Sequence, residues 1–209
     1  MEGRILDNLI ERYPMLEVCR QSINDAAGKI MACYEDGGKL LLCGNGGSGA
    51  DCDHIAGELM KGFLKKRPLS DGTKSAFSAL GCECIADKLQ LGLPAVNLCA
   101  HSALIGAVAN DLGESLVYAQ QVMALGKQGD VLLGISTSGN AENILNAMAA
   151  SKVLGVKTIG LTGRTGGKMG SFAETCICVP AGTTPEIQEL HLPVYHAICA
   201  MVEAHFFEV

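Results

Sequence analysis

The chain has 209 residues and a formal net charge of −6; 48% of its residues are hydrophobic, 18% are charged, 4% are aromatic, and tryptophan is absent. This length fits one large domain with an extensive core. The acidic balance and the few aromatic side chains argue against nucleic acid as a partner, because such binding calls for a basic surface and, on single strands, for stacking platforms. No apolar run approaches the roughly 20 residues that span a bilayer, so we expect no membrane partner.

The ten cysteines do not indicate a disulfide framework in a chain of this length. Most of them lie within apolar segments, where a free thiol packs as a small hydrophobic group. The first residues lack the charged region and apolar core of a secretion leader. We therefore expect reduced thiols in a cytoplasmic protein. Cys82 and Cys84 form one CxC pair, which lacks the second pair that such a zinc site needs.

Residues 1–37 form an N-terminal helical segment by their apolar spacing, which predicts two helices broken near Pro14 and ended by the glycines after Asp36. The period then changes. Residues 39–43 predict a short buried strand, followed by a small polar loop and a helix over 49–63.

The same order of strand, loop and helix recurs to the end of the chain. Strands are expected at 94–98, 130–135, 156–161 and 175–179, and helices at 100–110, 141–154 and 185–207, with a glycine-rich loop at 162–170. This alternation predicts one α/β domain over 1–209, a doubly wound five-stranded parallel sheet with flavodoxin-like layers and N-terminal helices. Residues 65–92 fit the pattern least; we expect an excursion from the domain, with a turn at 67–72 and a short helix within 78–91.

Two loops at expected strand ends are small and polar, Gly44 to Ser48 and Ser136 to Asn140. Ligands of open parallel sheets bind beyond the carboxyl ends of the strands, where helix N-termini offer free N–H groups. The three hydroxyls of the second loop favour a phosphate monoester. Tight turns also need glycine for conformational reasons alone, and neither loop has the spacing of a Walker A or dinucleotide-binding motif.

The chain offers a second set of polar residues at helical spacing. His54 and Glu58 share one face of a predicted helix and can hold one zinc ion, although such pairs are often plain surface interactions. The closing helix adds Gln188, His191 and His196, which equally fit a solvated face. Gln188 and His196 are eight residues apart, about 12 Å on a straight helix. Either Pro193 bends the helix or a pocket combines ligands from two subunits; we favour the shared pocket and hence an oligomer.

Several of these segments together resemble one family. The run Cys43-Gly44-Asn45-Gly46-Gly47-Ser48, followed by His54-Ile55-Ala56-Gly57-Glu58-Leu59, is similar to the opening signature of the SIS-domain phosphoheptose isomerases, which are sedoheptulose 7-phosphate isomerases. The resemblance covers residue 38 to the end. Further matching segments follow in that family's order: Asn110-Asp111, residues 129–140, Leu161-Thr162-Gly163 and residues 187–191.

The resemblance implies a homotetramer with active sites at subunit interfaces and one zinc ion per subunit. It implies zinc ligands at His54, Glu58, Gln188 and His196, with Glu58 and His196 moving protons between the first two sugar carbons through an enediol. The implied product of sedoheptulose 7-phosphate is D-glycero-D-manno-heptose 7-phosphate. The implied substrate contacts are Asn45, Gly46, Gly47, Ser48, Glu58, Asn110, Asp111, Ser136, Thr137, Ser138 and Gln188.

Three positions depart from the family pattern: Ala141 replaces a frequent serine, Lys61-Gly62 stands where an arginine is usual, and His101 replaces a common aspartate. These departures leave open an isomerase of another sugar phosphate. A different class is also open, since some SIS relatives are non-catalytic adaptors that bind a replication initiator. Those relatives lose the glutamate and the final histidine, so the presence of Glu58 and His196 favours an enzyme.

Overall fold

The computed structural model describes residues 2–207. Five parallel strands form one sheet in the order β2-β1-β3-β4-β5, which is a flavodoxin-like order. The predicted doubly wound five-stranded parallel sheet is therefore confirmed. The strands are β1 (Leu40–Gly44), β2 (Ala95–Asn97), β3 (Val131–Ile135), β4 (Lys157–Gly163) and β5 (Thr175–Val179).

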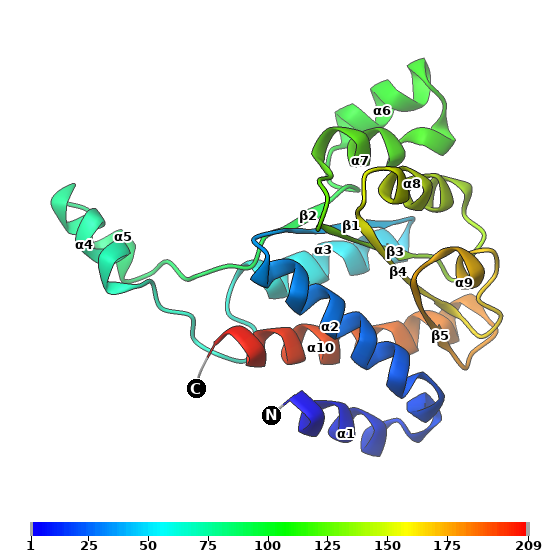
Figure 1. The fold of residues 1–209 in the computed structure, drawn as a ribbon, viewed down its shortest axis with the longest axis horizontal. Helices are drawn as coiled ribbons and strands as arrows, with labels where there is room; N and C mark the ends of the chain where they lie inside the picture. The colour runs from blue at the N-terminus through cyan, green and yellow to red at the C-terminus, as the bar shows by residue number, and fades with distance from the viewer. Residues whose placement is uncertain (1, 208–209) are drawn as a thin grey trace.

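Helices cover both faces of the sheet because the side chains of each strand alternate between two apolar clusters (Figure 1). Leu40 and Leu42 pack with α2 (Arg20–Glu35), α3 (Gly47–Met60) and α10 (Thr184–Phe206). Leu41 and Cys43 pack on the other face, where the helices are α6 (Ser102–Asp111), α7 (Ala119–Leu125), α8 (Glu142–Val153) and α9 (Met169–Phe172).

The N-terminal segment extends the first of these clusters, because α1 (Glu2–Arg12) packs on α10 and buries Leu6, Leu9 and Ile10 there (Figure 1). The 3-10 helix η1 (Pro14–Cys19) separates α1 from α2, and Pro14 occupies its first position. Proline fits there because its fixed φ suits a helix start and it has no N–H to leave unpaired. The expected break near Pro14 is thus present.

The excursion projects away from the body of the domain (Figure 1). It holds α4 (Asp71–Ala79) and α5 (Glu83–Ala86), and α4 has no buried residue. The predicted short helix within 78–91 is present as α5, but the turn predicted over 67–72 extends too far, because the helix α4 already begins at Asp71. The helix begins at Asp71 because the Ser70 hydroxyl caps it, accepting the Thr73 N–H at 3.3 Å, and it ends before Gly81 at φ +69°.

Three short helices lie in segments for which no element was predicted. These are η2 (Glu114–Leu116), α7 and α9, which have three, seven and four residues. Helices this short do not show a clear helical spacing of apolar residues in the sequence. Within residues 2–207, every helix is too short or too polar to cross a membrane.

Candidate active site

The two glycine-rich loops meet at one edge of the sheet, because β1 and β3 are neighbours and Gly44 pairs in register with Ile135. After β1 the chain turns directly into α3, whose first residue is Gly47, with Gly46 at φ +54° before it. A Cβ on Gly44 would lie 2.5 Å from the Ser48 carbonyl oxygen. Only glycine allows this tight turn. The N–H groups of Ser48 and Gly49 donate back to the Asn45 and Gly46 carbonyls, each at 3.0 Å, which leaves the N–H of Gly47, the first residue of α3, to face a ligand.

Side chains from outside the first loop fix its conformation. The amides of Asn45 and Asn143 hydrogen bond to each other reciprocally, at 3.0 Å in both directions. The Tyr118 hydroxyl donates to the carbonyl of Gly44 at 2.7 Å and lies 3.1 Å from Asn45 Oδ1. Sequence reasoning missed Asn143 and Tyr118. Asn143 is close behind the second loop in sequence, but nothing local marks Tyr118, which reaches the loop only through the fold.

The second loop rests on the third glycine-rich segment of the chain. Gly139 has φ +66°, and its backbone lies so close to the Gly166 carbonyl that a Cβ would overlap with it. The Gly163 N–H donates to the Thr137 carbonyl at 3.1 Å. The glycine-rich segment 163–167 therefore packs closely against the backbone of the second loop. Ala141 is the N-cap of α8 and contributes no side-chain cap. The serine that is frequent here in the family that the sequence resembles would supply a hydroxyl at this helix start, and alanine does not.

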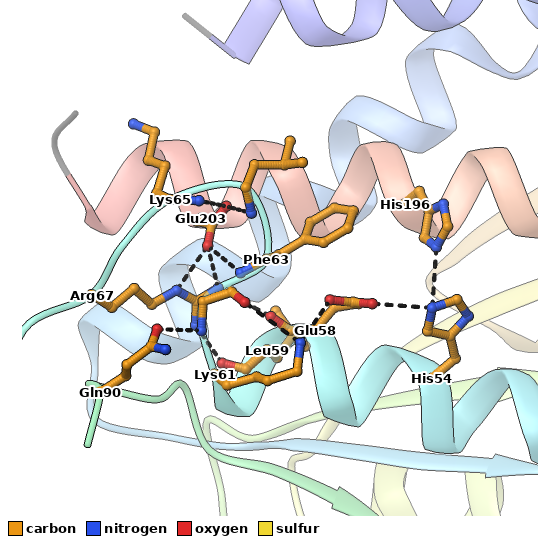
Figure 2. Close-up of polar contacts among 12 residues, drawn as sticks. His54, Glu58, Leu59, Lys61, Phe63, Lys65, Arg67, Gln90, His196 and Glu203 are labelled. Atoms are coloured by element: carbon orange, nitrogen blue, oxygen red, sulfur yellow. Dashed lines mark hydrogen bonds and ion pairs between the residues drawn. The ribbon is translucent and has the colours of Figure 1, made fainter. Parts of the chain in front are cut away.

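Three of the predicted residues converge further along α3, two to three turns beyond the first loop. His54 and Glu58 lie one turn apart on α3, and His196 reaches them from α10 (Figure 2). His54 Nε2 is 3.0 Å from Glu58 Oε1 and 3.4 Å from His196 Nε2. One ligand atom from each of the three residues lies within 4.8 Å of the others. Within residues 2–207, no other group of three histidine, cysteine, aspartate or glutamate side chains meets this condition.

A hydrogen-bond chain behind His54 fixes its ring. Tyr195 Oη lies 2.9 Å from His54 Nδ1 and donates to Asp51 Oδ1 at 3.3 Å. Because the tyrosine proton goes to the carboxylate, the hydroxyl oxygen accepts the Nδ1–H of His54. The Nε2 lone pair then faces Glu58 and His196. Sequence reasoning missed Asp51 and Tyr195, although Tyr195 is the immediate neighbour of His196.

The electrostatic surroundings keep His196 neutral. Burial lowers the pKa of His196, the nearby His54 lowers it further, and Glu58 opposes the shift. Burial raises the pKa of Asp51, while the Tyr195 hydrogen bond and His54 oppose that change. A neutral imidazole at position 196 can accept a proton or bind a metal ion.

The donor set fits a zinc ion. Two nitrogens and a carboxylate oxygen are ordinary zinc ligands, and bonds of about 2.0–2.1 Å in a tetrahedron separate neighbouring ligand atoms by about 3.3 Å. The distances of 3.0 and 3.4 Å around His54 Nε2 are close to that separation. With Nδ1 protonated, His54 Nε2 and Glu58 Oε1 are two acceptors that repel each other unless a proton or metal cation lies between them.

Gln188 lies at the other end of the crevice. Its amide lies against Gly47, where a Cβ would overlap with Gln188 Nε2. The helix α10 is unbroken from Thr184 to Phe206 with Pro193 inside it, so eight residues, about 12 Å, separate Gln188 from His196 along its axis. Within one chain the structure thus joins three of the four predicted zinc ligands and places Gln188 beside the first loop.

Other residues named from the sequence lie outside the cluster. His191 is fully buried, and burial lowers its pKa to about 4, with the Thr162 backbone opposing the shift. Asn110 and Asp111 end α6, and the Asn110 amide donates to the Asp111 carboxylate at 2.7 Å. Their predicted substrate contacts stay predictions. All ten cysteines, Cys82 and Cys84 included, are free thiols.

The departures from the family pattern have definite places in the structure. Lys61 Nζ is 3.4 Å from Glu58 Oε2, so a cation does approach the carboxylate after α3. The Gly62 N–H donates to Gln90 Oε1 at 3.0 Å, which ties the chain after α3 to the end of the excursion. His101 is the N-cap of α6, and its Nδ1 lies 3.0 Å from Gln121 Oε1.

Fold and site together define a class, an α/β domain with a flavodoxin-like parallel sheet whose glycine-rich loops follow β1 and β3 at their carboxyl ends, where such sheets bind ligands. The sequence matches the model of the SIS domain over residues 8–81 and 78–163. The chain belongs to the SIS-domain family of phosphoheptose isomerases.

The relatives extend over nearly the whole chain. A phosphoheptose isomerase from Desulfovibrio desulfuricans is 39% identical over 186 residues, which are 89% of this chain and 78% of the relative. The solved phosphoheptose isomerase from Neisseria gonorrhoeae superposes with a TM-score of 0.75 at 32% identity, covering 95% of this chain and 94% of that one. The one from Francisella tularensis gives 0.77 at 31% identity, covering 97% and 96%.

Proposed function

We propose that this protein is an aldose–ketose isomerase that converts sedoheptulose 7-phosphate into D-glycero-D-manno-heptose 7-phosphate. The observation that carries the proposal is the meeting of Glu58 and His196, which are 138 residues apart in sequence, at the helix α3 that begins at the first glycine-rich loop. An acid–base pair and an anion site joined by one helix suit a reaction that moves a proton within a phosphorylated sugar.

The phosphate would bind at the two loops. The N–H of Gly47 at the start of α3 and the hydroxyls of the second loop offer donors without any lysine, which suits a monoester dianion. His54 is seven residues beyond Gly47 on α3, roughly 10 Å along the helix. The phosphate is thereby held at a distance from the proton-transfer groups, which suits a substrate that carries its phosphate at the end opposite the carbonyl. The proposed binding residues are Asn45, Gly46, Gly47, Ser48, Ser136, Thr137, Ser138, Asn110, Asp111 and Gln188.

The proton transfer falls to Glu58 and His196. The carboxylate oxygen of Glu58 that does not face His54 takes a proton from the sugar carbon next to the carbonyl, and the neutral His196 exchanges protons with the adjacent oxygens through the ring nitrogen that does not face His54. The enediol that results regains a proton on the neighbouring carbon, so that no atoms are gained or lost overall. Half-burial of both side chains limits competing proton exchange with water.

We further propose one zinc ion per subunit at His54, Glu58 and His196. When bound, zinc acts as a Lewis acid that stabilises negative charge on a substrate oxygen. Gln188 of the partner subunit would complete the ligand set in a homotetramer, since Gln188 of the same chain lies by Gly47. A cytoplasmic location belongs to the same proposal and is supported by the ten free thiols.

The test is an isomerase assay over ketose phosphates of five to seven carbons, together with the zinc content per chain. Turnover is expected to be greatest with sedoheptulose 7-phosphate. Glu58→Gln should abolish turnover and leave the fold intact, while Glu83→Gln on the exposed α5 should leave the rate unchanged. A protein with no turnover on any of these sugars would be a non-catalytic adaptor instead, and the proposal would be wrong.

A further inference from the structure

A buried ion pair lies at the end of α3, next to the candidate site (Figure 2). Arg67 and Glu203 are 0% and 1% exposed. Arg67 Nε and Nη2 lie 2.9 and 2.8 Å from Glu203 Oε1. The sequence predicts a turn around Arg67, and Glu203 lies near the C-terminal end of α10. No local sequence pattern therefore predicts this ion pair.

The carboxylate of Glu203 binds the chain that follows α3. It accepts the backbone N–H groups of Phe63 at 2.8 Å, Leu64 at 2.7 Å and Lys65 at 3.1 Å. Three successive amides around one carboxylate form a closed anion nest. The loop after α3 is thus held to α10 by this carboxylate, and the Lys65 ammonium adds a second contact by donating to the Phe207 carbonyl at 2.6 Å.

The guanidinium of Arg67 binds the end of α3 itself. Nη1 donates to the Leu59 carbonyl at 2.6 Å and Nη2 to the Glu58 carbonyl at 3.0 Å. The last carbonyls of a helix have no partners within the helix, and a cation there also interacts favourably with the helix dipole. Arg67 therefore caps α3 at the residue whose side chain belongs to the candidate acid–base pair.

The ion pair joins α3 to α10, because Arg67 binds the end of α3 and Glu203 lies on α10. Glu203 and His196 are seven residues apart on α10, two turns, so they lie on the same side of that helix. We infer that Arg67 and Glu203 are positioning residues that set the separation between the Glu58 carboxylate and the His196 imidazole. This inference rests on the proposed function.

The pair is better suited to this role than an apolar contact would be. A buried ion pair costs desolvation, and well-packed apolar residues often replace one without loss of stability. Here, however, Glu203 and Arg67 also satisfy three backbone N–H groups and two helix-end carbonyls. Apolar substitutes would remove the partners of the loop N–H groups and of the Glu58 carbonyl, although the Leu59 carbonyl would keep the Leu93 N–H at 2.9 Å. The ion pair therefore fixes the backbone of the loop after α3 and of the end of α3, which positions Glu58 relative to α10.

Glu203→Gln and Arg67→Lys test the inference, with Lys66→Met, an exposed neighbour, as the control. Glu203→Gln keeps the shape but converts one acceptor oxygen into a donor that opposes the loop N–H groups. We expect kcat to fall ten- to a hundredfold with KM changed less than threefold, because the phosphate loops lie at the far end of α3. Zinc affinity, measured by competition with a chromophoric chelator, should fall about tenfold, and the control should match the wild type in all three quantities.

Both variants are to be measured well below their melting temperatures, with circular dichroism as a check of the fold. Wild-type kcat and wild-type zinc affinity in a folded variant with a lowered melting temperature would show a structural role alone and overturn the inference. If the wild type itself turns over no sugar phosphate, the proposed function fails. The zinc affinities of the two variants then still decide whether the pair positions Glu58 and His196.

Discussion

The hydroxyl of Tyr195 lies 2.9 Å from Nδ1 of His54 and donates a hydrogen bond to Asp51 Oδ1 at 3.3 Å. The two rings meet edge to face, with centroids 5.5 Å apart. His54 is therefore fixed in tautomer and in ring orientation by the residue next to His196 on α10. The helix that supplies one proposed zinc ligand also orients another, so the two histidines are positioned as a unit.

Replacing Tyr195 by Phe should weaken zinc binding ten- to a hundredfold, the range found when outer-shell partners of metal ligands are removed. The ring packing is kept, so unfolding free energy should fall by only about 1 kcal/mol for the lost hydrogen bond. Chelator competition measures the affinity, and urea titration measures the stability. Tyr13→Phe, at the boundary of α1 and η1, is the matched control. Equal zinc affinity in Tyr195→Phe and the control would show that the hydroxyl does not orient His54.

The buried His191 should make stability depend on pH. Its pKa is about 4 in the folded chain and 6.5 for the ordinary side chain, so the unfolded chain binds more protons between these values. Its stabilising effect is full above pH 6.5 and is lost as pH falls toward 4, with a slope of at most about 1.4 kcal/mol per pH unit. His191→Phe should flatten the curve of unfolding free energy over this window.

His205 supplies a control, because its pKa is shifted in the opposite direction to that of His191. Hydrogen bonds to Glu35 and Glu2 raise the pKa of His205, so its stabilising effect is present below pH 6.5 and is lost as pH rises through the folded value. His205→Gln should therefore lower stability on the acid side and leave the alkaline side unchanged. A curve for His191→Phe that parallels the wild type between pH 4 and 6.5 would contradict the assignment of a neutral core histidine.

The elements that the sequence predicts well are those with a local cause. Residues 40–43 form a strand because apolar side chains face both layers, and the turn after them needs Gly44 and Gly46 whatever lies beyond. These causes are present in a short window of residues. The pair His54 and Glu58 is likewise visible as a helical spacing.

The rest depends on contacts between distant segments. Arg67 reads as part of a turn, since its partner Glu203 is 136 residues away, and no local pattern distinguishes it from an exposed arginine. Tyr118 and Tyr195 read as core aromatics, and their hydroxyls acquire roles only when the fold brings Gly44 and His54 to them. The start of α4 is hard to predict for a different reason: Ser70, whose hydroxyl caps the helix, lies in a segment whose proline and glycine also fit a turn.

Gly139→Ala should be strongly destabilising, because φ is +66° and the added Cβ would overlap with the Gly166 carbonyl. The left-handed conformation alone costs roughly 1–2 kcal/mol, and displacement of the second loop should also raise KM for the phosphorylated substrate severalfold. Gly170→Ala is the control: it lies in α9 with open space around a Cβ, so it should be neutral or slightly stabilising. Thermal unfolding and steady-state kinetics measure both effects, and equal melting temperatures would contradict the close packing of the two loops.

Ala141→Ser restores a hydroxyl at the start of α8 and should improve both stability and substrate binding. Ala141 has φ −62° and ψ 116° without a side-chain cap, the extended conformation in which a serine accepts an N–H of the first turn. A serine N-cap is worth about 1 kcal/mol over alanine, so the melting temperature should rise by a few degrees.

The new hydroxyl also borders the second loop, so KM should fall. The value of kcat should stay unchanged, since Glu58 and His196 lie further along α3, away from the phosphate loops. Ala141→Gly separates the two effects, because glycine caps almost as well but adds no donor. If Ala141→Ser and Ala141→Gly share one KM, position 141 does not contact the phosphate.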